Sequence, residues 1–170
     1  MSRFLTGWAR DMKSKGDFPS RPKRLPEVFS TYELPLYFVT ANTLGRRALL
    51  ARVTIHTAFQ EYGQQNAAYG RAIGRYVIMP DHLHIFVRLP ATSRLAVFVQ
   101  LLKQCLTKVL KAEGEEPPFW QTGFFDHVLR NDENYAAKWA YVHQNPVRAG
   151  LVTEAEAWPY QGEFGIIDRA

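Results

Sequence analysis

The segment from Tyr76 to Pro90, YVIMPDHLHIFVRLP, places the strongest constraint on what this chain can fold into. Two runs rich in β-branched and aromatic residues, Tyr76–Met79 and Leu83–Leu89, predict two strands joined by a turn at Pro80-Asp81. Successive side chains of a strand point to opposite faces of its sheet. In the second run one face then carries Leu83, Ile85, Val87 and Leu89, and the other carries His82, His84, Phe86 and Arg88.

The histidine pair His82 and His84 is the first candidate for a functional site. Two imidazoles at alternate positions of a strand share one face and lie about 7 Å apart along the chain. At that spacing their ring nitrogens could converge on one metal ion or one phosphate. The alternative is two half-exposed histidines on a strand, because an isolated His-x-His pattern has many false positives.

The other elements follow from hydrophobic periodicity and from residues that end helices. Further strands are predicted at Leu36–Thr40 and Phe124–Leu129. Three helices are predicted at Arg46–Gln65, Arg94–Glu113 and Glu133–Gln144, the last with Asp132 as its N-cap and Pro146 just beyond its end. The expected buried positions are Leu49, Val53, Ala58 and Tyr62 in the first helix, and Val97, Leu101, Cys105, Leu106 and Val109 in the second.

The order of these elements is strand, helix, strand, strand, helix, strand, and then an additional helix. This order predicts an α+β fold of the ferredoxin-like (split βαβ) type, an antiparallel sheet with two helices on one face. Those helices would cover Leu83, Ile85 and Val87, so the histidine face would lie opposite, under the third helix. We expect one domain over residues 34–170, with the segment around Trp158 packing back on it.

Composition narrows the class of protein. A chain of 170 residues with 46% hydrophobic and 22% charged residues is typical of a globular domain. It has neither an apolar run of membrane-spanning length nor a secretory signal, and its one cysteine excludes a disulfide framework. We therefore expect a cytoplasmic protein without membrane contacts. The net charge of +5 favours a polyanionic partner without naming one.

Residues 1–33 form a basic leader for which we expect irregular structure. Lys, Arg and Pro are mixed there with little periodicity, and Lys23 and Arg24 are available for phosphate contacts. A merely solubilising tail explains the same composition.

The third helix carries the second candidate group. At 100° per residue Tyr135, Trp139 and Val142 form its core stripe, and Tyr141 lies roughly 120° away from that stripe with Lys138 and Asn145 near it. The phenol of Tyr141 is therefore free for chemistry, unless it is an amphipathic tyrosine at the rim of the core. His143 lies on a different face of the helix.

Taken together these residues suit phosphodiester chemistry. His82, His84 and the Asn145 carbonyl oxygen could bind a divalent ion that polarises a phosphate. Tyr141 could then attack in line and form a phosphotyrosine. A phenol has a pKa near 10, so the attack needs help, for which Lys138 is the candidate, with water or the metal as alternatives.

At this point the chain resembles a known family. The segments MPDHLHIFV, WQTGFFDHVLRND and YVHQNPVRAGLV are similar to those of the single-tyrosine HUH transposases (IS200-like), specifically the REP-associated tyrosine transposases. The resemblance runs over most of the chain from Leu36 to Trp158. It implies a ferredoxin-like fold, His82 and His84 as metal ligands with Asn145 completing the site, and Tyr141 as the nucleophile.

The resemblance also implies an activity. Enzymes of this kind use Mg²⁺ or Mn²⁺ to cut single-stranded DNA near a hairpin, which leaves a 5′-phosphotyrosine and a free 3′-OH that can rejoin another strand. Insertion-sequence relatives act as dimers that exchange the tyrosine helix, whereas the REP-associated branch can act as a monomer, so both states remain open.

Four other polar residues receive weaker assignments. Arg130 and Arg148 lie at the ends of elements, where phosphate contacts are plausible. His127 and Asp126 lie in the resembling FFDHVLR segment, but strand alternation alone does not say which of them faces the histidines.

Two other classes of function stay open. The first is a catalytically silent module that binds hairpin DNA or RNA through its basic surface. The second is a metal-dependent phosphodiesterase that uses water in place of the tyrosine.

Overall fold

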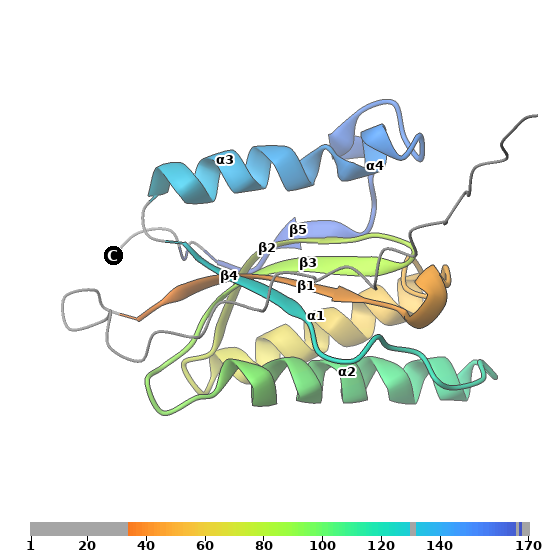
Figure 1. Cartoon of the computed structure of the whole chain (residues 1–170), viewed down its shortest axis with the longest axis horizontal. Coiled ribbons are helices and arrows are strands. Elements are labelled where there is room, and N and C mark those ends of the chain that lie inside the picture. Colours follow the sequence, from red (N-terminus) through yellow and green to blue (C-terminus); the bar gives the residue numbers. More distant parts are fainter. Residues whose placement is uncertain (1–33, 130–131, 166, 168–170) are drawn as a thin grey trace, which may run out of the picture.

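Five antiparallel strands form one sheet in the order β4-β1-β3-β2-β5 (Figure 1). The computed structural model describes residues 34–129, 132–165 and 167. The strands are β1 (Leu36–Asn42), β2 (Ala72–Ile78), β3 (His82–Arg88), β4 (Phe125–Leu129) and β5 (Gln161–Glu163). The first four lie in the 4-1-3-2 order of the predicted ferredoxin-like fold, which confirms that prediction.

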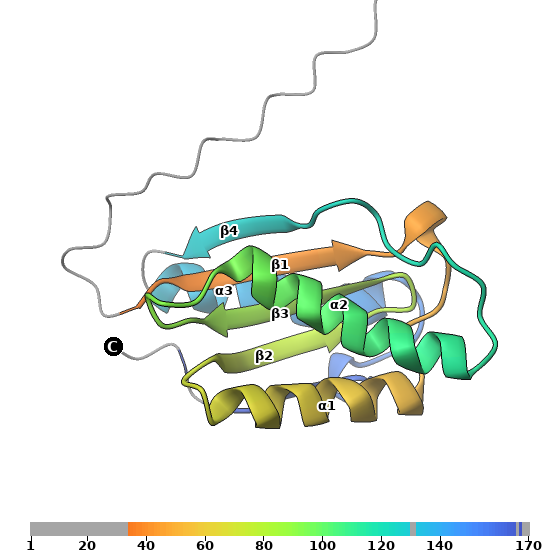
Figure 2. The ribbon, with the colours of Figure 1, turned by 90° about the horizontal axis from the view of Figure 1, so that it is seen from below.

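The helices form a layer on each side of the sheet. Helices α1 (Val53–Ala67) and α2 (Leu95–Ala112) lie side by side across one face (Figure 2). Helix α3 (Asp132–His143) lies on the opposite face, and the short α4 (Asn145–Arg148) follows it (Figure 1). Two 3-10 turns, η1 (Leu44–Arg46) and η2 (Ala155–Ala157), complete the described elements. The predicted α+β architecture with a separate tyrosine helix is confirmed.

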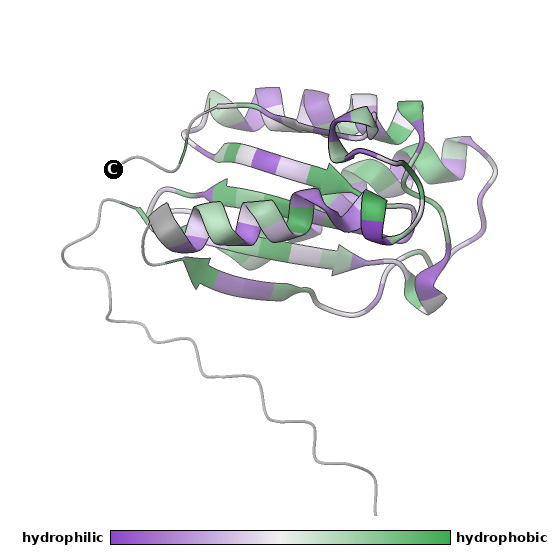
Figure 3. Cartoon of the chain, turned by 90° about the horizontal axis from the view of Figure 1, so that it is seen from above, coloured by the Kyte–Doolittle hydropathy of each residue, from purple (hydrophilic) through white to green (hydrophobic). Residues whose placement is uncertain are grey.

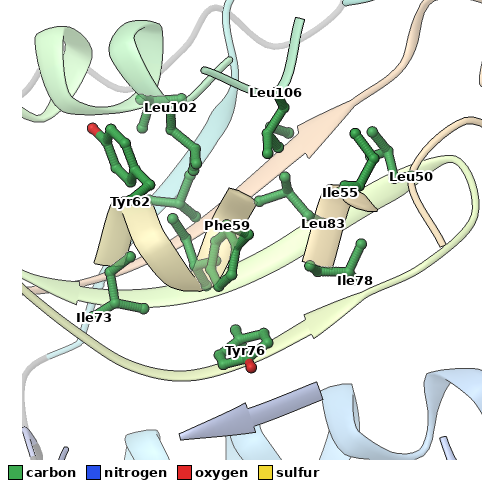
Figure 4. Close-up of a cluster of buried hydrophobic side chains, with 14 of the residues drawn as sticks. Leu50, Ile55, Phe59, Tyr62, Ile73, Tyr76, Ile78, Leu83, Leu102 and Leu106 are labelled. Carbon is green, nitrogen blue, oxygen red and sulfur yellow. The ribbon is translucent and has the colours of Figure 1, made fainter. Parts of the chain in front are cut away.

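The main core lies between the sheet and the pair α1 and α2. Leu83, Ile85 and Val87 of β3 are fully buried there, as predicted from the alternation of the strand. They pack in one cluster with Phe59 of α1 and Leu102 of α2 (Figure 4). A smaller cluster on the other face joins Phe38 and Phe86 of the sheet to Tyr135 and Val142 of α3. Both faces of β3 are therefore covered, and the histidines share the α3 face with this second cluster.

Helix α1 begins later than the sequence predicted. Its first residue is Val53, not Arg46, and the Val53 side chain is 71% exposed instead of buried. The chain turns first, because Gly45 and Arg46 have positive φ angles of 62° and 57°. Leu49 is buried as expected, but in the loop before the helix. This loop brings Arg46 to the histidine end of the sheet.

Helix α2 has nearly the predicted bounds but presents a different stripe to the core. Val97 and Leu101, predicted to be buried, are 45% and 42% exposed. The buried residues are Leu95, Phe98, Val99, Leu102, Leu106 and Leu110. In a helix this rich in apolar residues several stripes satisfy the same periodicity, and packing against the sheet selects the one that contains Phe98.

Strand β2 begins at Ala72, four residues before its predicted start, and contains an irregularity. Its register with β3 shifts between Ile73 and Tyr76. A bulge of this kind changes which face the following side chains occupy. Ile73 and Tyr76 therefore both lie in the α1–α2 core, while Arg75 reaches Tyr135 and Trp139 of α3.

The segment after α4 returns to the sheet, as predicted. The Trp158 indole nitrogen donates to the Ile78 carbonyl oxygen at 2.9 Å, and β5 then pairs with β2. The fifth strand itself was not predicted. None of the helices in the part of the chain that the structure describes is long and apolar enough to span a membrane.

Candidate active site on the α3 face of the sheet

Strand β3 places both histidines on the face covered by α3. His84 lies opposite Thr40 of β1, and His82 lies opposite Asn42. The centroids of the two imidazole rings are 4.7 Å apart, with the ring planes at 81° to one another. The predicted convergence of two imidazoles on one point of the sheet is therefore present.

The ring of His84 is held from two sides. Its Nδ1 lies 2.8 Å from the Thr40 hydroxyl, and the ring stacks on Phe38 with centroids 5.4 Å apart. Burial, together with the charges of His82, Arg46, Lys138 and Arg148, lowers the pKa of His84 to about 3. The imidazole is thus neutral, and when Nδ1–H donates to Thr40, Nε2 presents a lone pair for a ligand.

A carboxylate orients the ring of His82. Nδ1 of His82 lies 2.6 Å from Oδ1 of Asp81, and Oδ2 of Asp81 pairs with Nε of Arg46 at 2.7 Å. Burial lowers the pKa of His82, and the hydrogen bond and charge of Asp81 oppose that effect in part. A carboxylate on Nδ1–H fixes the tautomer in which Nε2 is free, as is usual for histidines that bind metals.

Asp81 and Arg46 were missed as site residues. The sequence predicts Asp81 as a turn residue and Arg46 as the start of a helix. The adjacent Asp81-His82 pair was the available signal for the carboxylate. The position of Arg46 depends on the positive φ of the η1 turn, which no pattern in the sequence predicts.

Helix α3 presents Tyr141 away from the core. Tyr135 and Val142 are each 1% exposed, whereas Tyr141 is 63% exposed. The predicted orientation of this helix is therefore confirmed. Seen from the α3 side, the helix lies along the middle of the sheet (Figure 3).

Arg148 of α4 covers Tyr141 and contacts Asn145. Its guanidinium carbon lies 4.1 Å from the centroid of the Tyr141 ring, and its Nη2 donates to the Tyr141 carbonyl oxygen at 2.6 Å. The same nitrogen donates to Oδ1 of Asn145. Asn145 is the first residue of α4. Its side-chain oxygen, the predicted metal ligand, is thus already engaged by a cation.

Lys138 lies between α3 and the sheet. Its Nζ is 5.2 Å from the centroid of Phe38, the ring on which His84 stacks. The charges of both Lys138 and Arg148 act on His84. Helices α3 and α4 therefore bring four predicted residues to the face of the sheet that carries the histidine pair: Lys138, Tyr141, Asn145 and Arg148. The charges of Arg148 and Lys138 make that face basic.

The register of the edge strand β4 shows which face of the sheet carries His127 and which carries Asp126. His127 lies opposite Phe38 and Asp126 opposite Val39. Residues that pair directly across strands share a face. His127 is therefore on the histidine face with Phe125, whose side chain is 60% exposed, and Asp126 is on the α1–α2 face. Lys23, Arg24 and Arg130 lie outside the residues that the structure describes.

The donor set suits a divalent cation. Within the described ranges, no three His, Cys, Asp or Glu side chains lie together as a group that could hold a metal ion. Two neutral imidazoles with free Nε2 atoms plus one oxygen donor form a mixed nitrogen and oxygen set that leaves positions for water and phosphate. The chemistry of the residues therefore fits a divalent cation.

A ferredoxin-like sheet with a histidine pair, faced by a helix with an exposed tyrosine, defines a class of DNA transposases. The family described as "Transposase IS200 like" matches residues 34–145, and the chain belongs to this family. The chain is similar to relatives that are named REP-associated tyrosine transposases.

Two relatives and one solved structure are similar to the chain. A putative REP-associated tyrosine transposase of Haemophilus influenzae is 29% identical over 136 residues, covering 74% of this chain and 77% of the relative. The REP-associated tyrosine transposase of Escherichia coli is 25% identical over 124 residues, covering 73% of each chain. A solved REP-associated tyrosine transposase bound to a REP hairpin has the same fold, with a TM-score of 0.64, 24% identity and coverage of 82% of this chain and 87% of that one.

Proposed function

We propose that this transposase cuts and rejoins single-stranded DNA beside hairpins through a covalent 5′-phosphotyrosine at Tyr141, with Mg²⁺ or Mn²⁺ held by His82, His84 and Asn145. The observation that carries the proposal is the pair of neutral imidazoles on the face that α3 covers. Hairpin DNA is proposed because one solved relative is bound to a REP hairpin. The domain that does this spans residues 34–170.

Each residue has a distinct part in the proposed reaction. A divalent ion bound there would supply Lewis-acid polarisation of the scissile phosphate. Tyr141 Oη forms the new bond to phosphorus, the bond from phosphorus to the 3′ oxygen breaks, and that oxygen takes a proton to become a 3′-OH. The phenol proton goes to water, and Lys138 favours the phenolate by its charge. In the second step a 3′-OH attacks the phosphotyrosine and releases the phenol.

Arg148 is well placed to receive the phosphate. Its guanidinium lies on the Tyr141 ring and holds Asn145, so a phosphate oxygen could replace the amide as its partner. Asn145 would then be free for the metal. In this proposal the contact between Arg148 and Asn145 is the arrangement of Asn145 before a phosphate and the metal are bound.

The experiment that tests the proposal is a denaturing gel with hairpin oligonucleotides from the flanks of the protein's own gene. We expect an SDS-resistant protein–DNA adduct with Mn²⁺, and none with a chelator. Hairpin binding without an adduct under any condition would favour the silent binding module. Cut ends without attached protein would favour the water-dependent phosphodiesterase.

Asp81→Asn is expected to weaken Mn²⁺ binding by about 10-fold, because partners that orient a metal-binding histidine contribute 10–100-fold to affinity and the asparagine keeps an acceptor for His82. Calorimetric titration with Mn²⁺ measures the change. Asp126→Asn, which alters a carboxylate on the other face of the sheet, is the control. Equal Mn²⁺ affinities of the Asp81 variant and the wild type would show that Asp81 does not support the metal site.

Arg148→Ala is expected to weaken hairpin binding for every DNA sequence and to reduce the slope of log K against log salt by about 0.7–0.9, the value for one phosphate contact. Anisotropy titrations at several salt concentrations measure the slope. Lys108→Ala removes one exposed positive charge from α2, on the far side of the sheet, and should leave it unchanged. An unchanged slope for Arg148→Ala would show that Arg148 meets no phosphate.

A further inference from the structure

The guanidinium of Arg46 lies against the histidine pair. Its Nε pairs with Oδ2 of Asp81 at 2.7 Å, and its Nη1 donates to Oδ1 of Asn42 at 2.9 Å. Asn42 is the residue opposite His82 across the sheet. With these two contacts in place, Nη2 of Arg46 lies 3.4 Å from Nδ1 of His82. The guanidinium is therefore on the face of the sheet that carries both histidines.

Nη2 of Arg46 has no acceptor in the part of the chain that the structure describes. Nδ1 of His82 lies closer to Oδ1 of Asp81, at 2.6 Å, and donates its proton there. A ring nitrogen that carries a proton cannot also accept one, so the approach of Nη2 to Nδ1 brings two donors together. The Arg46 side chain is 51% exposed, so the N–H groups of Nη2 are open to a bound molecule.

The position of this guanidinium is fixed before any substrate binds. The Asn42 amide that accepts from Arg46 donates in turn to Oε1 of Gln121 at 3.3 Å. The backbone N–H of Thr43 donates to the Asp81 carbonyl oxygen at 2.9 Å, which ties the turn to the second partner of Arg46. Arg46 itself has a φ of 57°, in the left-handed region that costs free energy for a residue with a Cβ. Such conformations persist where the surrounding structure holds them, often at functional sites.

The attack proposed for Tyr141 fixes the side on which the leaving oxygen lies. In phosphoryl transfer the attacking and leaving oxygens lie roughly in line through phosphorus. Tyr141 comes from α3, above the sheet, so the leaving 3′ oxygen points away from α3 (Figure 1). Lys138 and Arg148 belong to α3 and α4, on the side of the attack, whereas Arg46 reaches the histidines from the end of β1.

We propose that Arg46 is a catalytic residue, which donates from Nη2 to the 3′ oxygen as the bond from phosphorus to that oxygen breaks. The Tyr141 Oη forms its bond to phosphorus, the electron pair of the broken bond goes to the 3′ oxygen, and water then protonates it. The guanidinium keeps its own protons and stabilises the negative charge that develops on the oxygen. In the rejoining step the same hydrogen bond aims the 3′-OH at the phosphotyrosine.

This assignment rests on the proposed function, and it differs from a purely orienting role of Arg46. A residue that merely holds Asp81 acts through His82, so its loss slows the cleavage of every substrate alike. A residue that donates to the leaving oxygen matters most when the leaving atom is a strong base. The dependence on the leaving atom therefore separates the two roles.

The test compares two hairpin oligonucleotides that differ by one atom at the cut linkage, which carries either the natural 3′ oxygen or a bridging 3′ sulfur. A thiolate is a much weaker base than an alkoxide and needs little help to leave. Rates of adduct formation are measured with the full chain at saturating Mn²⁺. For Arg46→Ala we expect a loss of about 100-fold with the oxygen substrate and less than about 3-fold with the sulfur substrate, since removing one such donor typically costs 10²–10³-fold.

Arg46→Lys is the second variant. It keeps a positive charge for Asp81 but replaces the fork of donors by a single nitrogen, so it should show the same selective loss. Lys108→Ala, which removes an exposed charge from α2, is the control and should cleave both substrates at wild-type rates.

Equal losses with the two substrates, or no loss with the oxygen substrate, would overturn the assignment of Arg46 while the wild-type adduct upholds the proposed function. A wild-type protein that forms no adduct with either substrate would overturn the proposed function, and the role of Arg46 with it.

Discussion

Tyr141→Phe is expected to abolish the covalent adduct and DNA cleavage, with a loss of at least about 10⁴-fold in rate, while hairpin binding changes by less than about 2-fold. The substitution removes only a hydroxyl from a side chain that is 63% exposed, so the fold should be intact. Loss of a nucleophile typically has effects of this size or larger. Binding survives because phosphate contacts dominate the affinity for DNA.

The matched control for this variant is Tyr69→Phe. Tyr69 is 71% exposed and follows α1, on the other side of the sheet. It should form the adduct at the wild-type rate. If Tyr141→Phe still forms an SDS-resistant adduct, another residue is the nucleophile and the assignment of Tyr141 is wrong.

His84→Ala is expected to remove metal binding and cleavage together. Changing only a residue that orients a metal-bound histidine costs 10–100-fold in affinity, so loss of the ligand itself should cost more than about 100-fold. Calorimetric titration with Mn²⁺ and the adduct gel measure the two effects on the same preparation. Circular dichroism melting checks that the variant folds, since the His84 ring also stacks on Phe38.

The control for the metal assignment is His56→Ala. Nε2 of His56 lies 2.8 Å from the Tyr76 hydroxyl, on the α1 side of the sheet and away from the histidine pair. It should keep both the metal and the adduct. Wild-type rates of cleavage in His84→Ala would show that the ion, if one is needed, binds elsewhere.

The parts of the structure that the sequence predicted are those set by local periodicity. Alternation in β3 was enough to place Leu83 and Ile85 on one face and His84 on the other. The helical spacing of Tyr135 and Val142 was enough to turn Tyr141 outward. Such patterns repeat every 2 or about 3.6 residues, and one sheet with helices on both faces preserves them.

The parts that the sequence did not predict depend on single residues in unusual backbone conformations. Gly45 and Arg46 delay the start of α1, and the bulge after Ile73 turns Arg75 toward α3. Strand β5 is only three residues long and contains Gly162, so it has no strand pattern of its own. Strand β5 forms because the backbone groups at the edge of β2 offer it hydrogen-bond partners.

The same division holds for the candidate site. His82, His84 and Tyr141 lie on regular elements, so pattern and resemblance located them. Asp81 and Arg46 lie in turns, where the direction of a side chain depends on the path of the backbone. The contact between Arg148 and Asn145 depends on the short helix α4, which the sequence did not predict.

The path of the chain around α3 has a consequence for the position of Tyr141. The segment that contains Tyr141 leaves from β4 at one edge of the sheet and returns as β5 at the other. The segment that carries Tyr141 is therefore held at both edges of the sheet that carries the histidines. We expect that loosening of the three-residue strand β5 would change the distance between Tyr141 and the histidine pair.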